Sequence, residues 1–263
     1  MLPGLTTNIP SISTFADPQV SSAQDSGQNP SKAVAYWLRR DIVRGVFAPL
    51  ERLRLEHLVS FYRSGHTPVR EAIVMLSSSG LAIHEYQKGY HVAPVSLEDY
   101  DDVVAVYQRL YKVALGMSID RGDEAWEERV VVQLHRSGKV PKALPEDDPV
   151  AREKWQRAYW EFHAVILSGC GSPLLMQLLG DIGFRLERYV NLFADLESER
   201  EVDHAPDHRQ IADAVVARDA PRATKLIEAY FASAQPIRDS IIARLRDEQP
   251  ASRRAARSRA SAA

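Results

Sequence analysis

The run His66-Thr67-Pro68-Val69-Arg70 carries the residue types best suited to chemistry in this chain of 263 residues. The hydroxyl of Thr67 can cap a helix by accepting a hydrogen bond from an unpaired backbone N–H. Pro68 then suits the first helical position, where no N–H is needed. Arg70 follows in the first turn, beside backbone N–H groups that attract anions. The run therefore predicts a helix start that contacts phosphates and base edges in the major groove of DNA.

The apolar spacing defines the helix that must position these side chains. Val69, Ile73 and Leu76 lie at i, i+4 and i+7, which places them on one inward face. Turn residues and periodicity predict three neighbouring elements: a helix ending near Gly45, a short helix over 55–62, and a two-stranded hairpin over 81–84 and 90–93.

The order and spacing of these elements resemble the winged helix-turn-helix of GntR-type transcription regulators. In that family the helix that enters the major groove (the reading helix) begins Ser-Arg-Thr-Pro-Val-Arg-Glu-Ala, and the wing carries Arg-Gly. The resemblance covers about residues 32–95 and implies that this region binds double-stranded operator DNA. By position, it assigns DNA contacts to Arg54, Gly65, His66, Thr67, Arg70, Lys88 and Gly89.

Several of these positions depart from the family pattern. Gly65 and His66 stand where Ser-Arg is usual, Lys88 replaces the wing Arg, and Leu50 replaces a Gly. Replacing Arg by His removes a side chain that can bind guanine through two parallel hydrogen bonds. We therefore expect the affinity or base preference to differ from the family's norm.

Charge is distributed unevenly along the chain. The net charge is −2, but residues 32–95 hold nine Lys or Arg and five Asp or Glu, a net of +4. Four arginines after residue 250 add a basic tail, so the remainder is strongly acidic. A basic segment beside an acidic body suits a DNA-binding protein whose affinity falls with salt.

Composition limits the remaining classes of protein. With 45% hydrophobic residues the chain can form sizeable cores, and its single cysteine, Cys170, cannot form an intramolecular disulfide. No apolar run of about 18 residues predicts a membrane span, and the N-terminus lacks the features of a secretory signal. We expect a cytoplasmic protein with no membrane partner. The predicted organisation is a disordered arm over 1–30, a DNA-binding domain over 31–95, an all-α domain over 96–248, and a disordered tail over 249–263.

After Pro94 the periodicity becomes helical. Segments near 97–115, 123–138, 148–168, 172–196, 204–218 and 220–247 predict an antiparallel bundle of about six helices. Pro236 falls inside the last segment and is expected to kink it or end it early. The predicted fold class is therefore mainly α: a winged helix-turn-helix with a small β-wing, followed by an all-α bundle.

This bundle resembles the FCD domain, the ligand-binding and dimerisation domain of FadR-type regulators. Glu161-Phe162-His163 resembles the family's Phe-His segment, and Asp207-His208-x-x-Ile211 resembles its Glu-His-x-x-Ile segment. Arg109 lies where the family carries an Arg on the first bundle helix. The resemblance implies a homodimer whose DNA binding responds to a small molecule, an organic acid or an acyl ester.

In many FCD domains one Asp and two or three His hold a divalent metal. Here Tyr159 and Tyr230 stand at two of those positions, and His163 and His208 remain. Two imidazoles without a carboxylate are a poor metal site. We therefore expect no cofactor, with Arg109, Tyr159, His163, His208 and Tyr230 forming a metal-free ligand site. A metal held by His163 and His208, and a filled core with no effector, remain as alternatives.

Two classes of function remain at this stage. The first is a repressor or activator whose ligand changes the placement of its DNA-binding heads. The second is an all-helical metalloenzyme built on His163 and His208. The chain has no His-Glu-x-x-His, P-loop or Gly-rich dinucleotide motif to support the second class, so we expect a regulator and not an enzyme.

Overall fold

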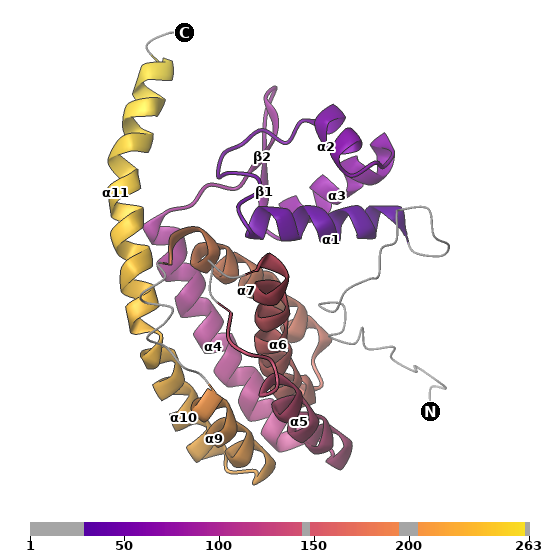
Figure 1. Ribbon diagram of the computed structural model, residues 1–263, viewed down its shortest axis with the longest axis vertical. Helices are drawn as coiled ribbons and strands as arrows, with labels where there is room; N and C mark the ends of the chain where they lie inside the picture. The colour runs from indigo at the N-terminus through magenta and orange to yellow at the C-terminus, as the bar shows by residue number, and fades with distance from the viewer. Residues whose placement is uncertain (1–28, 144–147, 195–204, 261–263) are drawn as a thin grey trace. The chain divides into compact units, whose positions relative to one another are not determined.

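A computed structural model describes residues 29–143, 148–194 and 205–260, so most of the predicted N-terminal arm lies outside the described residues. The contacts divide the chain into two compact units. The head unit holds the described residues of Val20–Gln108, Leu179–Val202 and Ser233–Ala263. The bundle unit holds those of Arg109–Leu178 and Asp203–Ala232. Figure 1 shows the order of the elements along the chain, and each unit is described by itself.

Three helices open the head unit: α1 (Pro30–Val43), α2 (Leu55–Phe61) and α3 (His66–Ser78). Helix α1 begins there because the Asn29 side chain accepts a hydrogen bond from the Ser31 N–H at 3.0 Å, with a proline at the first position. The three predicted helices of the helix-turn-helix are therefore confirmed.

The predicted wing is confirmed as an antiparallel pair of strands, β1 (Ala82–Glu85) and β2 (Gly89–Val92). Gln87 and Gly89 have positive φ angles of 61° and 85°, which lets the chain reverse within three residues. The backbone N–H of Leu53 donates to the Tyr90 carbonyl at 2.8 Å, so a backbone hydrogen bond joins the segment before α2 to the wing.

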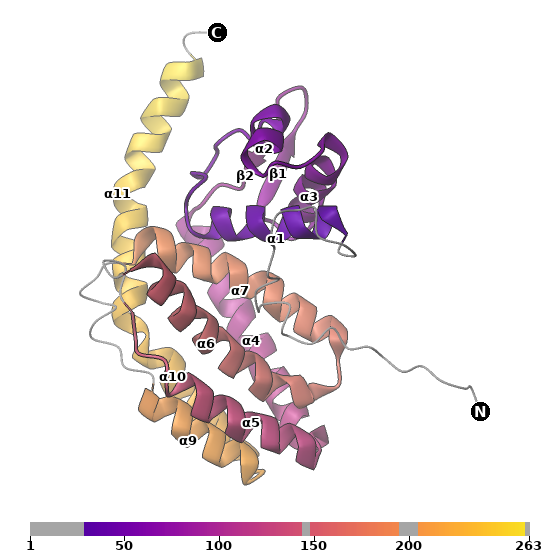
Figure 2. The ribbon, with the colours of Figure 1, turned by 45° about the vertical axis from the view of Figure 1, so that its right-hand side comes forward.

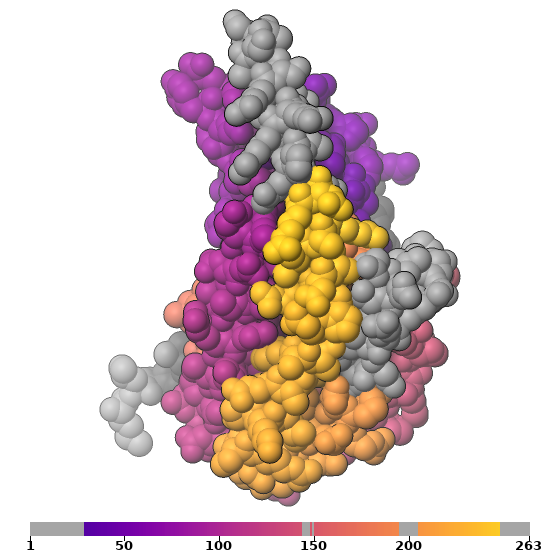
Figure 3. All heavy atoms as spheres, turned by 90° about the vertical axis from the view of Figure 1, so that its left-hand side faces the viewer, coloured from indigo at the N-terminus to yellow at the C-terminus, as the bar shows by residue number. Residues whose placement is uncertain are grey.

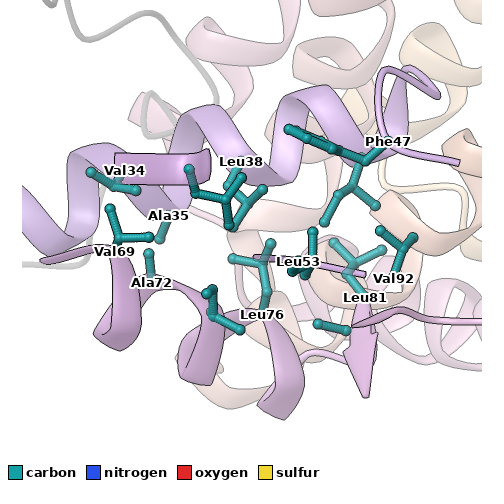
Figure 4. Close-up of a cluster of buried hydrophobic side chains, with 14 of the residues drawn as sticks. Val34, Ala35, Leu38, Phe47, Leu53, Val69, Ala72, Leu76, Leu81 and Val92 are labelled. Carbon is teal, nitrogen blue, oxygen red and sulfur yellow. The ribbon is translucent and has the colours of Figure 1, made fainter. Parts of the chain in front are cut away.

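The core of the head lies between α1, α3 and the wing. Figure 4 shows side chains of α1 and α3 pointing toward one another across this core. Val69, Ile73 and Leu76 are at most 2% exposed, as the apolar spacing predicted. Truncating Ile73 or Leu76 to Ala is expected to cost about 2–5 kcal/mol. This core fixes the orientation of α3, whose opposite face is exposed.

The start of α3 differs from the prediction. The helix begins at His66 with Gly65 as its N-cap, and Thr67 therefore lies inside the first turn and does not cap it. Pro68 is tolerated there because the first four N–H groups of a helix have no partner within it. The Thr67 side chain is exposed, so its hydroxyl lies on the outer surface of the helix start.

Helical segments make up the rest of the described chain, as predicted: α4 (Leu97–Arg121), α5 (Glu124–Ser137), α6 (Pro149–Leu167), a 3-10 turn η2 (Ser168–Cys170), α7 (Pro173–Phe193), α9 (Ala205–Val216), α10 (Ala220–Ser233) and α11 (Gln235–Ala260). Within the bundle unit, α5 packs against α6 and α9 (Figure 2). No described helix is long and apolar enough to cross a membrane.

The last predicted segment divides near its proline. Helix α10 ends at Ser233 and α11 starts at Gln235, so Pro236 lies in the first turn of a new helix, and the predicted interruption is confirmed. Helix α11 then continues to Ala260, although the sequence suggested an unstructured tail from residue 249. Ala and Arg are strong helix formers, which accounts for this continuation without an apolar face.

Within the head unit, α7 contacts the winged domain at two places, the end of α1 and the residue after the wing. The Arg188 guanidinium donates to the Ala93 carbonyl at 2.7 Å, and the Asn191 amide donates to the Val43 carbonyl at 3.1 Å. Burial lowers the pKa of Arg188 to about 10. Tyr189 donates to Asp99 at 2.7 Å, at the start of α4.

A second apolar cluster completes the head unit. It joins the starts of α4 and α11 to the end of α7 through Tyr100, Tyr189, Phe193, Ile241 and Leu245. The side of α11 that faces away from this cluster lies at the molecular surface, as Figure 3 shows in yellow. The described head is therefore larger than the winged domain alone, because α7 and α11 contribute to its packing.

Candidate functional site

The outer face of the α3 start gathers the polar side chains that the sequence singled out. His66, Thr67 and Arg70 are exposed, and Val69 is buried. Arg70 lies four residues after His66 and three after Thr67, so it neighbours both on the outer side of the helix. No acidic side chain lies in the first turn. The unpaired N–H groups and the helix dipole therefore attract anions here, which suits contact with phosphates and base edges.

His66 has a partner that the sequence did not indicate. Its Nε2 lies 3.1 Å from both carboxylate oxygens of Glu56 in α2. Both side chains are largely exposed, at 59% and 81%. The pair therefore occupies one ring nitrogen of His66. It also brings a carboxylate beside the exposed face of the α3 start, which we call the reading face.

The remaining predicted DNA contacts lie around α2 and the wing. Arg54 is exposed at the N-cap of α2 and makes no side-chain capping bond. Lys88 is 73% exposed and pairs with Glu85 at 2.9 Å, an interaction that lowers the pKa of Glu85. A Cβ on Gly89 would lie 3.9 Å from the Arg52 guanidinium, so Arg52 is a basic neighbour of the wing that the sequence reading did not select.

Two other exposed residues escaped the sequence analysis. Tyr86 lies beside the tip of the wing and is 84% exposed. Arg63 lies between α2 and α3 with a φ of 48°. A tyrosine and an arginine in turns are ordinary in a sequence, and only the backbone geometry and exposure distinguish them.

A second set of polar side chains is buried inside the bundle unit. The Tyr111 hydroxyl and His163 Nδ1 are hydrogen-bonded at 2.8 Å, and His163 Nε2 and the Tyr230 hydroxyl at 3.0 Å. The hydroxyls of Tyr159 and Tyr230 also form a hydrogen bond. We call Tyr111, Tyr159, His163, His208 and Tyr230 the tyrosine–histidine cluster.

His208 joins this cluster through its ring. It stacks on Phe162 with ring centroids 4.3 Å apart and meets the His163 ring edge-on at 5.0 Å. His163, His208 and Tyr230 are at most 7% exposed, whereas Tyr159 is only partly buried. The cluster therefore extends from the buried Tyr111 to Tyr159, which is its least buried member.

The structure brings together four of the five predicted ligand-binding residues, which are Tyr159, His163, His208 and Tyr230. Arg109 differs because its side chain is exposed, so it does not join the buried cluster as an anchor. Tyr111 replaces it as the fifth member. The sequence analysis did not select Tyr111 as a ligand-binding residue, because its partner His163 lies 52 residues away.

The donor set of the cluster does not fit the divalent-metal site that the FCD resemblance implies. Both ring nitrogens of His163 already bond to tyrosine hydroxyls. A divalent ion in such a site needs an imidazole lone pair and carboxylate or further imidazole ligands. Within the described residues no group of three or more His, Cys, Asp or Glu is placed to hold a metal. The tyrosines instead satisfy the histidine by hydrogen bonding.

The fold and the outer face of α3 define a winged helix-turn-helix protein with a helical second domain. Residues 30–92 match the gntR family of bacterial regulatory proteins, and residues 102–233 match the FCD domain. The chain therefore belongs to the GntR family of transcription regulators, in the group that carries an FCD domain.

Named relatives and solved structures agree with this family. The regulator BphR of Paraburkholderia xenovorans strain LB400, described as uncharacterized, is 34% identical over 74% of this chain and 80% of its own length. The transcriptional repressor GlaR of Escherichia coli strain K12 is 32% identical over 76% of this chain and 92% of its own. The fold is similar to that of E. coli McbR/YncC, with a TM-score of 0.61 and 15% identity over 84% of this chain and 99% of the other.

Proposed function

We propose that the chain regulates transcription as a homodimer that binds operator DNA through α3 and the wing. The exposed, acid-free first turn of α3 with Arg70 is the observation that carries this proposal. One helix-turn-helix head reads only a half-site, so two heads are needed for a palindromic operator. The regulator acts in the cytoplasm, where the operator DNA lies, and has no catalytic role.

We further propose that the tyrosine–histidine cluster senses a small organic acid or acyl ester. Two features support this: two hydroxyls bond to one buried imidazole, and the hydrogen bonds lead on from Tyr230 to Tyr159, whose side chain is only partly buried. A phenol O–H donates well to a carboxylate or ester oxygen. A ligand that accepts from Tyr159 would reorder the hydrogen bonds through Tyr230 to His163.

We also propose that this sensor works without a metal. The mismatch between the cluster and a divalent ion supports this, because His163 has no ring nitrogen left for coordination. The competing proposal keeps a metal on His163 and His208. Such a metal would have to displace at least one tyrosine hydroxyl from His163.

The test combines metal analysis with DNA binding of the full-length protein. Purified without chelators, the protein should contain no stoichiometric metal, and its melting temperature should not change with EDTA. Fluorescence anisotropy with DNA from upstream of its own gene should show binding that weakens with salt. Stoichiometric metal would contradict the metal-free sensor, and salt-independent or absent binding would contradict the DNA-binding face. Analytical ultracentrifugation checks for the dimer.

A further inference from the structure

Two arginines of this chain share an unusual backbone conformation. Arg63 has a φ of 48° and Arg218 a φ of 56°. In this left-handed region the Cβ atom crowds the backbone, so glycine is the favoured residue and an arginine costs free energy. An arginine at such a position therefore needs a side-chain contribution that glycine lacks.

Arg218 makes that contribution inside the folded bundle unit. Its guanidinium donates to the carbonyls of Ile119 and Gly122, each at 2.5 Å, and its Nε donates to Glu127 at 2.7 Å. It also lies over the Trp126 ring, 5.2 Å from the centroid. These contacts hold the end of α4 against the start of α5 and account for the left-handed residue.

Arg63 has no such explanation within the fold. Its backbone N–H donates to the Ser60 carbonyl at 3.3 Å, but its exposed side chain makes no hydrogen bond or ion pair in the part of the chain that the structure describes. The strain is therefore not offset by any contact of the guanidinium inside the described protein.

The position of Arg63 indicates where its side chain acts. It lies in the turn between α2 and α3, three residues before the start of the reading helix. In a helix-turn-helix, arginines and backbone N–H groups around the reading helix contact phosphates and fix its register in the groove. The carboxylate of Glu56 also lies at the start of α3, because it pairs with His66.

We propose that Arg63 binds a phosphate of the DNA backbone beside the groove that α3 reads. It thereby supplies a positive charge beside the His66–Glu56 pair. This inference rests on the proposed DNA binding and assigns to it a contact that the family resemblance did not give. The side chain positions α3 on DNA and reads no base.

The test is Arg63→Gly, with affinity and stability measured on the same protein. Binding to DNA from upstream of its own gene should weaken by about 5- to 10-fold, and the salt slope should fall by about 1, as expected for one lost phosphate contact. The melting temperature should stay the same or rise, because glycine suits the left-handed backbone. Arg63→Lys should retain the salt slope, because it keeps the charge.

Arg218→Gly is the matched control, because it also replaces a left-handed arginine. It should lower the melting temperature and leave the salt slope unchanged. The proposal is overturned if Arg63→Gly binds DNA with wild-type affinity and slope, or if it loses stability as Arg218→Gly does. Arg70→Ala shows whether a negative result concerns Arg63 alone or the whole proposed DNA-binding face. If Arg70→Ala still loses binding, the proposed reading face stands without Arg63, and if neither variant loses binding, the reading face itself fails.

Discussion

His66 and His163 show how the same residue type is accommodated in two regions of one molecule. His66 lies on the exposed start of α3, where a carboxylate at 3.1 Å is its hydrogen-bond partner and water is available to the rest of the ring. His163 is 4% exposed, and hydroxyls at 2.8 and 3.0 Å hold both of its nitrogens. Buried polar atoms need partners within the protein, whereas exposed ones do not. Changes on the reading face should therefore alter affinity, and changes in the cluster should alter stability.

Arg70→Ala tests the exposed half of this comparison and has the largest expected effect. Loss of a contact to a base edge or phosphate should reduce affinity by about 10- to 100-fold, in line with roughly 1–3 kcal/mol per good base contact. Stability to urea should not change, since Arg70 is exposed. Arg209→Ala, an exposed arginine of α9, is the control. Wild-type affinity at physiological salt would contradict the assignment of α3 as the reading helix.

Tyr230→Phe tests the buried half. It removes the hydroxyl that links Tyr159 to His163 and leaves a buried ring nitrogen without that partner. Urea unfolding should show a loss of about 1–3 kcal/mol, and the response of DNA binding to organic acids should disappear. The ligand-free variant should still bind DNA.

Tyr86→Phe provides the matched control, because the Tyr86 side chain is 84% exposed. Removing its hydroxyl should not change the free energy of unfolding. If Tyr230→Phe were as stable as wild type, the hydrogen bonds of the cluster would contribute nothing measurable. The contrast between the two histidines would then disappear.

His66→Arg sharpens the comparison by restoring the family's residue on the exposed side. Affinity for DNA should rise, by about 1–3 kcal/mol if the guanidinium reaches a guanine. Because Glu56 can pair with the new guanidinium, His66→Arg combined with Glu56→Gln should bind more tightly still. Unchanged affinity in both variants, measured by anisotropy titration, would mean that residue 66 does not face the groove.

Glu56→Gln alone has the smallest expected effect. It removes an exposed carboxylate beside the reading face, and exposed ion pairs contribute only about 0.2–1 kcal/mol. Affinity for DNA should therefore rise by a few-fold at low salt, with little difference at high salt, where charges are screened. A decrease in affinity would show that Glu56 holds His66 in a DNA-binding orientation, and that the carboxylate helps binding.

The features that the sequence predicted are those with a local cause. The inward face of Val69, Ile73 and Leu76 follows from helical periodicity, and the interruption near Pro236 follows from its missing N–H. The sequence predicted that α3 starts after Thr67, two residues later than it does. Gly65 and Thr67 are both acceptable N-cap residues, and local sequence does not choose between them.

The parts of the sites that escaped prediction depend on distant contacts or on backbone angles. The bond between Tyr111 and His163 crosses 52 residues, and the positive φ of Arg63 has no signature in residue type. Arg109 was selected by its position in a family pattern, but the helix presents it to solvent. The substitution of two metal-ligand positions by tyrosine was visible in the sequence, whereas the hydrogen bonds that those tyrosines make were not.

The contacts of α7 with Ala93 and Val43 have a practical consequence for anyone who cuts this protein into pieces. A fragment ending near residue 95 would lose Arg188 and Asn191, and Phe184, which packs against the core of the winged domain, would be lost with them. Apolar surface and two carbonyl groups would then meet water, so the excised piece should unfold at lower temperature and tend to aggregate. The winged domain should unfold cooperatively only when the end of α7 is still part of the protein. Residues distant in sequence therefore fold together with it.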